Sequence, residues 1–204
     1  MYYNIKMDDD RPLVILDLDN TCLCAIPYKD KDTVLNQDKY TYHDLETIFR
    51  IYERPGLQTF LDILFNNYKV GIWTAASIAY AIFVIKKCII AGRPERTLEF
   101  VLWDKHCKYS ERKSLNKQTK HIELLESLYD KNKLVLIDDN IDVLRQKKHT
   151  INSNYFDVVV ENAYKDTFLY HCPSILVQYF KSKKNRKYML KTEIEKLLKN
   201  NTIV

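Results

Sequence analysis

The chain has 204 residues, of which 46% are hydrophobic and 29% are charged, and its formal net charge is +5. This size and apolar content fit one globular domain, and no apolar run is long and uncharged enough to span a membrane. The start of the chain lacks the features of a signal peptide, and the five irregularly spaced cysteines suit reduced core thiols better than disulfides. We therefore expect an intracellular protein.

The first predicted element is a buried parallel strand that runs into two acids. An apolar run at 13–16 leads directly into Asp17 and Asp19. Residues two apart in an extended chain point the same way, so both side chains should project from the carboxyl end of the strand, where open α/β sheets bind ligands. Such a pair suits a cation or a phosphoryl group, and magnesium fits best because it prefers oxygen ligands. A solvated strand end before a turn is the alternative.

Strands and helices alternate along the rest of the chain. The patterns predict strands near 13–19, 47–53, 69–74, 98–102, 133–138 and 157–160, and helices near 57–67, 77–91, 118–130 and 174–184. This alternation indicates an α/β fold with a largely parallel central sheet flanked by helices. A right-handed, doubly wound topology would bring three of the strand ends to one edge.

Two later strand ends also carry polar groups. The strand near 69–74 ends in Thr74, and the strand near 133–138 ends in Asp138 and Asp139. If these strands are parallel to the first, all three ends share one edge of the sheet. Each group has a structural alternative, since Thr74 could be an ordinary strand residue and the acids could cap the helix that follows them.

A candidate catalytic lysine lies between these two strand ends in the sequence. Lys120 opens the helix predicted over 118–130, whose apolar residues follow the spacing of a helix packed on a sheet. An exposed lysine at a helix start is the alternative, and the nearby Lys113 and Lys117 leave the register open.

The order acid pair, hydroxyl, lysine and acid pair resembles the four motifs of the haloacid dehalogenase superfamily of phosphatases. Within that superfamily, the stretches 54–61, 72–81 and 136–143 look like the NLI-interacting-factor-like branch, which dephosphorylates the C-terminal domain of RNA polymerase II. The resemblance implies a haloacid-dehalogenase-like Rossmannoid fold without a large cap domain. It divides the chain into an N-terminal extension at 1–10, a catalytic domain at 11–181 and a basic, helical tail at 182–204.

The resemblance also implies catalytic roles. Asp17 would attack phosphorus and form an aspartyl phosphate. Asp19 would protonate the leaving group and later take a proton from water, and neighbouring carboxylates would raise its pKa for that purpose. Thr74 and Lys120 would hold the phosphoryl oxygens. The implied activity is that of a magnesium-dependent protein serine/threonine phosphatase.

The implied cofactor is one Mg²⁺ ion. By resemblance it would be held by the side chain of Asp17, the carbonyl oxygen of Asp19 and one acid of the second pair. We favour Asp139 as the direct ligand, in which case Asp138 would position Lys120 or a metal-bound water.

The expected partner is a phosphoprotein whose tail resembles the phosphorylated C-terminal domain of RNA polymerase II. However, the stretches 23–47 and 104–119, where the branch builds substrate-contacting loops, show no close match, and Asn20 and Cys22 depart from its usual motif. A phosphatase of small metabolites or nucleic-acid ends is therefore one alternative. A non-catalytic phosphopeptide-binding scaffold is the other.

The positive charge is concentrated near the end of the chain. Between residues 181 and 199 there are eight basic residues and two glutamates, so the rest of the chain is close to neutral. A solvated helical face explains this tail more simply than a nucleic-acid patch or a nuclear import signal. We expect no nucleic-acid or membrane partner, and a nuclear location would follow from the substrate.

Overall fold

The computed structural model describes residues 9–109, 119–144 and 149–182. Most of the expected extension and all but the first residue of the expected tail lie outside the described residues, as do Lys113 and Lys117. All five cysteines are described and buried, which confirms the core position expected for these thiols, and none of them forms a disulfide.

The central sheet has five parallel strands in the order β6-β5-β1-β7-β8. They are β1 (Leu13–Leu16), β5 (Lys69–Trp73), β6 (Leu98–Leu102), β7 (Leu134–Asp138) and β8 (Thr150–Asn152). From β1 the chain builds one side of the sheet with β5 and β6, then returns to the other side with β7 and β8. This doubly wound topology confirms the predicted fold class, and its strand order reverses between β1 and β7, where such sheets bind ligands.

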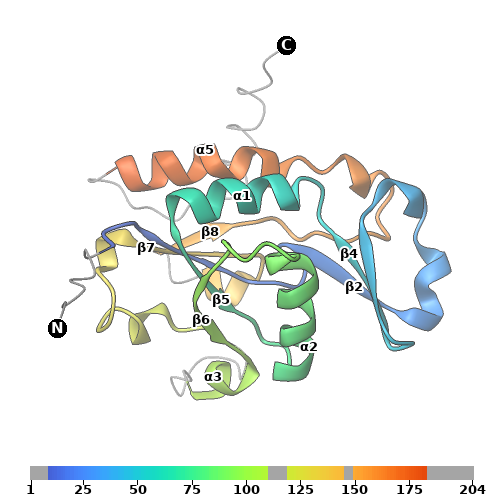
Figure 1. Cartoon of the computed structure of the whole chain (residues 1–204), viewed down its shortest axis with the longest axis horizontal. Coiled ribbons are helices and arrows are strands. Elements are labelled where there is room, and N and C mark those ends of the chain that lie inside the picture. The colour runs from blue at the N-terminus through green and yellow to red at the C-terminus, as the bar shows by residue number, and fades with distance from the viewer. Residues whose placement is uncertain (1–8, 110–118, 145–148, 183–204) are drawn as a thin grey trace, which may run out of the picture.

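Both faces of the central sheet are buried. In Figure 1, α1 (Leu57–Asn67) and α5 (Phe168–Lys181) lie side by side along one face of it. Val14 and Leu16 pack into the cluster that includes the apolar residues of these helices, whereas Leu13 and Ile15 pack into a second cluster. Alternate residues of β1 thus enter two cores, which explains why its sequence is a continuous apolar run.

Along the chain, between β1 and β5, an insertion forms a small antiparallel sheet in the order β2-β4-β3. Its strands are β2 (Leu23–Pro27), β3 (Tyr42–Leu45) and β4 (Phe49–Glu53), and 3₁₀ helices at Tyr28–Thr33 and Gln37–Lys39 connect β2 to β3. The strand predicted at 47–53 therefore exists as β4, but it belongs to this insertion and not to the central sheet. β2 and β3 were not predicted from the sequence.

The predicted helix at 77–91 forms in two parts, and the one at 174–184 begins early. α2 (Ile78–Val84) continues into a π-helix at Ile85–Ile90. α5 starts at Phe168, whose backbone N–H donates a hydrogen bond to a carboxylate oxygen of Asp166 at 3.0 Å. The helix then continues through Pro173. Short helices α3 (Asp104–Tyr109) and α4 (Ile141–Leu144) complete the fold. Among the described residues, no helix is long and apolar enough to cross a membrane.

Two predicted elements are wrong. In place of a helix over 118–130, the described residues form a 3₁₀ helix at Ile122–Leu124 followed by turns, because their backbone hydrogen bonds mostly span three residues. In place of a strand at 157–160 there is a turn, in which Asp157 accepts a hydrogen bond from the backbone N–H of Val159 at 3.0 Å. β8 takes the edge position of the central sheet instead.

Candidate active site

The carboxyl ends of β1, β5 and β7 surround one cavity. It is lined by Asp17, Asp19, Asn20, Thr74, Ala75, Ala76, Lys120, Asp138, Asp139 and Asn140. The parallel ladder places Leu16 between Ile72 and Ile137, so the residues that follow these three strands emerge together. All six residues singled out in the sequence therefore meet at one edge of the sheet.

Lys120 is buried at the centre of this cavity. Its ammonium contacts the carboxylate of Asp17 and donates to Oδ2 of Asp138 at 2.7 Å. Burial opposes the charged form of the lysine, but Asp138 and Asp17 outweigh it and hold the pKa of Lys120 above its usual value. Lys120 precedes the 3₁₀ helix and does not open an α-helix, yet it reaches both strand ends.

Three carboxylates converge beside this lysine. Oxygen atoms of Asp17, Asp138 and Asp139 all lie within 4.8 Å of one another. Burial raises the pKa of Asp17 well above its usual value; Lys120 lowers it, and the other two acids raise it further. Three clustered carboxylates form a donor set that fits a hard divalent cation such as Mg²⁺, since such ions are bound through oxygen.

The two acids at the carboxyl end of β7 have different neighbours. Asp138 accepts from Lys120 and from the backbone N–H of Asn140 at 2.8 Å, whereas Asp139 accepts from the Thr21 hydroxyl at 2.9 Å. The helix α4 is capped by Asn140, whose side chain accepts from the backbone N–H of Asp142 at 2.9 Å. Capping is thus performed by the neighbouring asparagine, and both carboxylates face the cavity.

Asp19 is paired with a tyrosine from α2. The hydroxyl of Tyr80 donates to Oδ1 of Asp19 at 2.5 Å, and its ring packs edge-on against Phe49 of β4. Burial raises the pKa of Asp19, while the hydrogen bond from Tyr80 lowers it. The expected direction of the shift is therefore present, but its cause is burial and not the neighbouring carboxylates. Tyr80 lies within the stretch 72–81 that carries the family resemblance, but no role was predicted for it.

Thr74 follows β5 and continues its ladder. Its backbone N–H donates to the carbonyl of Leu102 at 3.0 Å, and its hydroxyl accepts from the N–H of Ala76 at 3.1 Å. The hydroxyl is satisfied locally and also lines the cavity, so the structural interpretation and a role in binding are compatible.

The loop after β1 is held by a buried arginine that the sequence analysis did not single out for a role. Arg54 donates twice to the carboxylate of Asp166, at 2.9 and 2.8 Å, and also to the carbonyls of Thr21 and Asn154 at 3.0 and 3.1 Å. Asp166 lies 112 positions away along the chain. These bonds fix the backbone that carries Thr21 beside Asp139.

Comparison with known proteins connects this geometry to a family. A family model described as NLI interacting factor-like phosphatase matches residues 12–188. The chain is 39% identical over 145 residues to the CTD phosphatase-like protein 355R of Invertebrate iridescent virus 3, covering 65% of this chain and 76% of the viral protein. It is 38% identical over 156 residues to the protein of the same name from Invertebrate iridescent virus 6, covering 71% and 83%.

Solved structures with the same fold include RNA polymerase II CTD phosphatases. Fission yeast Fcp1 bound to beryllium fluoride matches with a TM-score of 0.54 and 23% identity, covering 86% of this chain and 52% of that chain. A second structure of Fcp1 matches with a TM-score of 0.51 and 19% identity, covering 93% and 61%. The chain thus spans a little over half the length of these proteins, and at such identities the likeness shows the fold alone.

Proposed function

The chain belongs to the NLI interacting factor-like phosphatase family, and from this premise we propose that it is a magnesium-dependent protein serine/threonine phosphatase acting through an aspartyl phosphate. We assign the catalytic domain to residues 11–181. The observation that carries the proposal is the convergence of Asp17, Lys120 and the two acids at the carboxyl end of β7 in one cavity.

The first step is attack on phosphorus by a carboxylate. Asp17 is the nucleophile in this proposal: one of its oxygens bonds to phosphorus while the bond from phosphorus to the serine or threonine oxygen breaks. The contact with Lys120 favours the ionised form of Asp17 against the effect of burial. The same ammonium lies where it can neutralise charge on the phosphoryl oxygens.

The leaving oxygen needs a proton, and the second step needs a base. Asp19 supplies both functions, because burial raises its pKa and Tyr80 holds its carboxyl group in the cavity. After the alcohol departs, Asp19 takes a proton from water as the water attacks phosphorus. The bond between Asp17 and phosphorus then breaks, and inorganic phosphate leaves.

The remaining polar groups neutralise charge. Thr74 would donate its hydroxyl to a phosphoryl oxygen, in addition to the hydrogen bond that it accepts from Ala76. Mg²⁺ would be held by Asp17, by the carbonyl of Asp19 and by Asp139, and when bound it would supply positive charge against the phosphoryl group. We favour Asp139 over Asp138 as the direct ligand of the second pair, because Asp138 accepts a hydrogen bond from Lys120.

A polypeptide is the substrate that the surroundings of the cavity favour. Ile141, which directly follows Asn140 of the cavity lining, is 65% exposed. An exposed apolar side chain next to a polar site offers a contact to a peptide that a sugar phosphate could not use. We propose a phosphorylated tail like the C-terminal domain of RNA polymerase II, and with it a nuclear location.

Hydrolysis of p-nitrophenyl phosphate tests the chemistry. Wild type should turn over in Mg²⁺ and not in EDTA, and Asp17→Asn should be inactive in Mg²⁺ although folded. Asp32→Asn serves as a matched control, because it makes the same substitution at a side chain that is 82% exposed and outside the cavity. Full activity of Asp17→Asn would exclude the aspartyl-phosphate mechanism.

A substrate panel tests the second half of the proposal. Phosphoserine and phosphothreonine peptides based on the polymerase tail should be hydrolysed with a higher kcat/KM than sugar phosphates or DNA with a 3′-phosphate. Preference for either of the latter would replace the protein substrate. Peptide binding by a folded wild type that shows no turnover would instead indicate a scaffold.

A further inference from the structure

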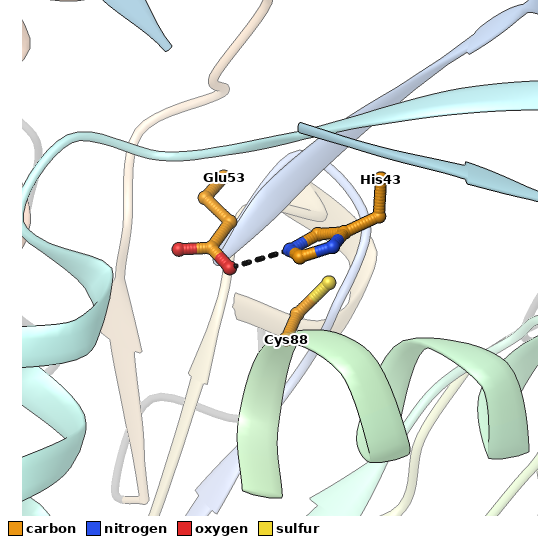
Figure 2. A group of neighbouring side chains, drawn as sticks. All are labelled: His43, Glu53 and Cys88. Carbon is orange, nitrogen blue, oxygen red and sulfur yellow. Dashed lines mark hydrogen bonds and ion pairs between the residues drawn. The ribbon is translucent and has the colours of Figure 1, made fainter. Parts of the chain in front are cut away.

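A second group of metal-ligating side chains lies outside the catalytic cavity. His43 of β3, Glu53 of β4 and Cys88 of the π-helix each offer a ligand atom, and these three atoms lie within 4.8 Å of one another. Figure 2 shows the three side chains pointing toward a common centre from two strands of the inserted sheet and from the helix beside them. None of the three has a role in the proposed phosphatase reaction.

The positions of the three residues follow from the fold. β3 and β4 pair with His43 opposite Ile51, so His43 and Glu53 lie two positions apart diagonally on one face of the inserted sheet. Nε2 of His43 lies 3.0 Å from Oε1 of Glu53. Cys88 faces them from the π-helix, a type of segment that is often found at functional sites.

A hydrogen-bond network fixes the carboxylate and the helix backbone. Gln58 donates from Nε2 both to Oε2 of Glu53 and to the carbonyl of Cys88, each at 2.9 Å. Its own side-chain oxygen accepts from Arg96 at 2.8 Å. The bond to Oε2 leaves Oε1 of Glu53 directed at His43. Supporting bonds of this kind commonly orient the ligands of protein metal sites.

We propose that His43, Glu53 and Cys88 form a zinc site that ties the inserted sheet to the helix carrying Tyr80. One nitrogen, one oxygen and one sulfur donor match the ligands of tetrahedral zinc, whereas magnesium takes oxygen alone. Around tetrahedral zinc, ligand atoms lie about 3.3–3.6 Å apart. Nε2 of His43 and Oε1 of Glu53, now 3.0 Å apart, would therefore separate slightly, and the sulfur of Cys88, which lies within 4.8 Å of both, needs a shift of about 1 Å at most. A carboxylate and a thiolate together balance the charge of Zn²⁺.

We place the fourth ligand in the open space beside the three side chains. A cavity lined by His43, Glu53, Lys86 and Lys87 reaches the group from outside, and the His43 side chain is 25% exposed. It provides a path of entry for the ion and room for a water as the fourth ligand.

A catalytic cysteine is the competing interpretation of these side chains. Reactive cysteines are partly exposed and have a lowered pKa. Cys88 is instead fully buried, and its pKa is raised mainly by burial and to a smaller extent by the negative charge of Glu53. Metal binding instead deprotonates the thiol as it forms the bond to sulfur, and it releases the proton to solvent.

Cobalt substitution tests the site without recourse to phosphatase activity. Full-length protein, stripped with a chelator and kept reduced, should bind one Co²⁺ with a near-ultraviolet thiolate-to-cobalt absorption band, and one Zn²⁺ should displace it. The band distinguishes this site from the catalytic cluster of Asp17, Asp138 and Asp139, which contains no sulfur. The test therefore has the same outcome whether or not the proposed phosphatase activity is correct.

Matched variants assign the band to the three ligands. Cys88→Ala should abolish it, and Cys172→Ala, which removes another fully buried cysteine, should keep it. His43→Gln changes a partly exposed ligand and should also weaken zinc binding, even if Cys88→Ala fails to fold. Gln58→Ala should weaken zinc binding about 10- to 100-fold, as loss of an outer hydrogen-bonding partner commonly does.

Two results would overturn the zinc site. One is a folded, reduced wild type that shows no thiolate band and binds no zinc in competition with a micromolar chelator. The other is a band that persists in both Cys88→Ala and His43→Gln, which would place the metal elsewhere.

Discussion

Replacing Arg54 with methionine should strongly destabilise the protein, because this arginine joins three distant parts of the chain. Its side chain is 0% exposed, and that of its partner Asp166 is 25% exposed. Methionine keeps much of the apolar contact with Phe156 and Phe168 but removes every hydrogen bond of the guanidinium.

The size of the loss follows from what is left without a partner. Removing one member of a buried ion pair costs about 3–5 kcal/mol, since the other charge stays buried and uncompensated. Because Asp166 is partly exposed, we expect the lower end, about 3 kcal/mol of the free energy of unfolding. The carbonyls of Thr21 and Asn154 also lose their donor, so Thr21 should hold Asp139 less firmly and phosphatase activity should fall.

Urea unfolding measures this loss. Arg93→Met is the control, because Arg93 pairs with Asp62 on the surface with both side chains more than 40% exposed, and its removal should change the free energy of unfolding only slightly. Arg54→Lys should fall between wild type and Arg54→Met, since lysine keeps the charge without the two parallel bonds. Equal stability of Arg54→Met and Arg93→Met would refute the reasoning.

Three further perturbations have expected outcomes. Gly56→Ala should lower the free energy of unfolding by about 1–2 kcal/mol because its backbone is left-handed, and by a further amount because the added Cβ would lie only 2.9 Å from the Tyr170 ring, which must move. Gly92→Ala is also left-handed but lies in open space, so it should show only the backbone cost, and equal losses of stability in urea would contradict this. Tyr80→Phe removes a hydrogen bond that lowers the pKa of Asp19, so the pKa should rise and the alkaline fall of kcat/KM should move to higher pH; an unmoved profile would exclude the coupling. EDTA should abolish hydrolysis without unfolding the chain by circular dichroism, excess Mg²⁺ should restore it, and turnover that persists in EDTA would exclude the metal.

Much of the fold could be predicted from local pattern. The apolar runs before Asp17, Thr74 and Asp138 predicted three neighbouring parallel strands, because a strand buried on both faces reads as continuous hydrophobic sequence. The same runs indicated which polar residues meet at the sheet edge. The two wrong elements show the limit of such patterns. The stretch 157–160 contains three consecutive valines, but so short an apolar run cannot distinguish a strand from a turn by its periodicity.

The candidate site was predicted where its residues follow strands, and missed where partners come from far along the chain. Nothing near Arg54 indicates Asp166, and nothing near Asp19 indicates Tyr80, because side-chain partners that distant are chosen by the packing of whole elements. The pKa of Asp19 shows the same limit, since burial and not the sequence neighbourhood sets its direction.

By itself the sequence determined the class of fold, the edge of the sheet where the acids gather and the family to which they point, since these depend on hydrophobic period and motif order. The tertiary structure alone decided how the inserted sheet pairs and which donors meet on it. His43, Glu53 and Cys88 are brought together by the pairing of β3 with β4 and by the helix packed beside them. Such contacts depend on three-dimensional packing, which no local stretch of sequence records.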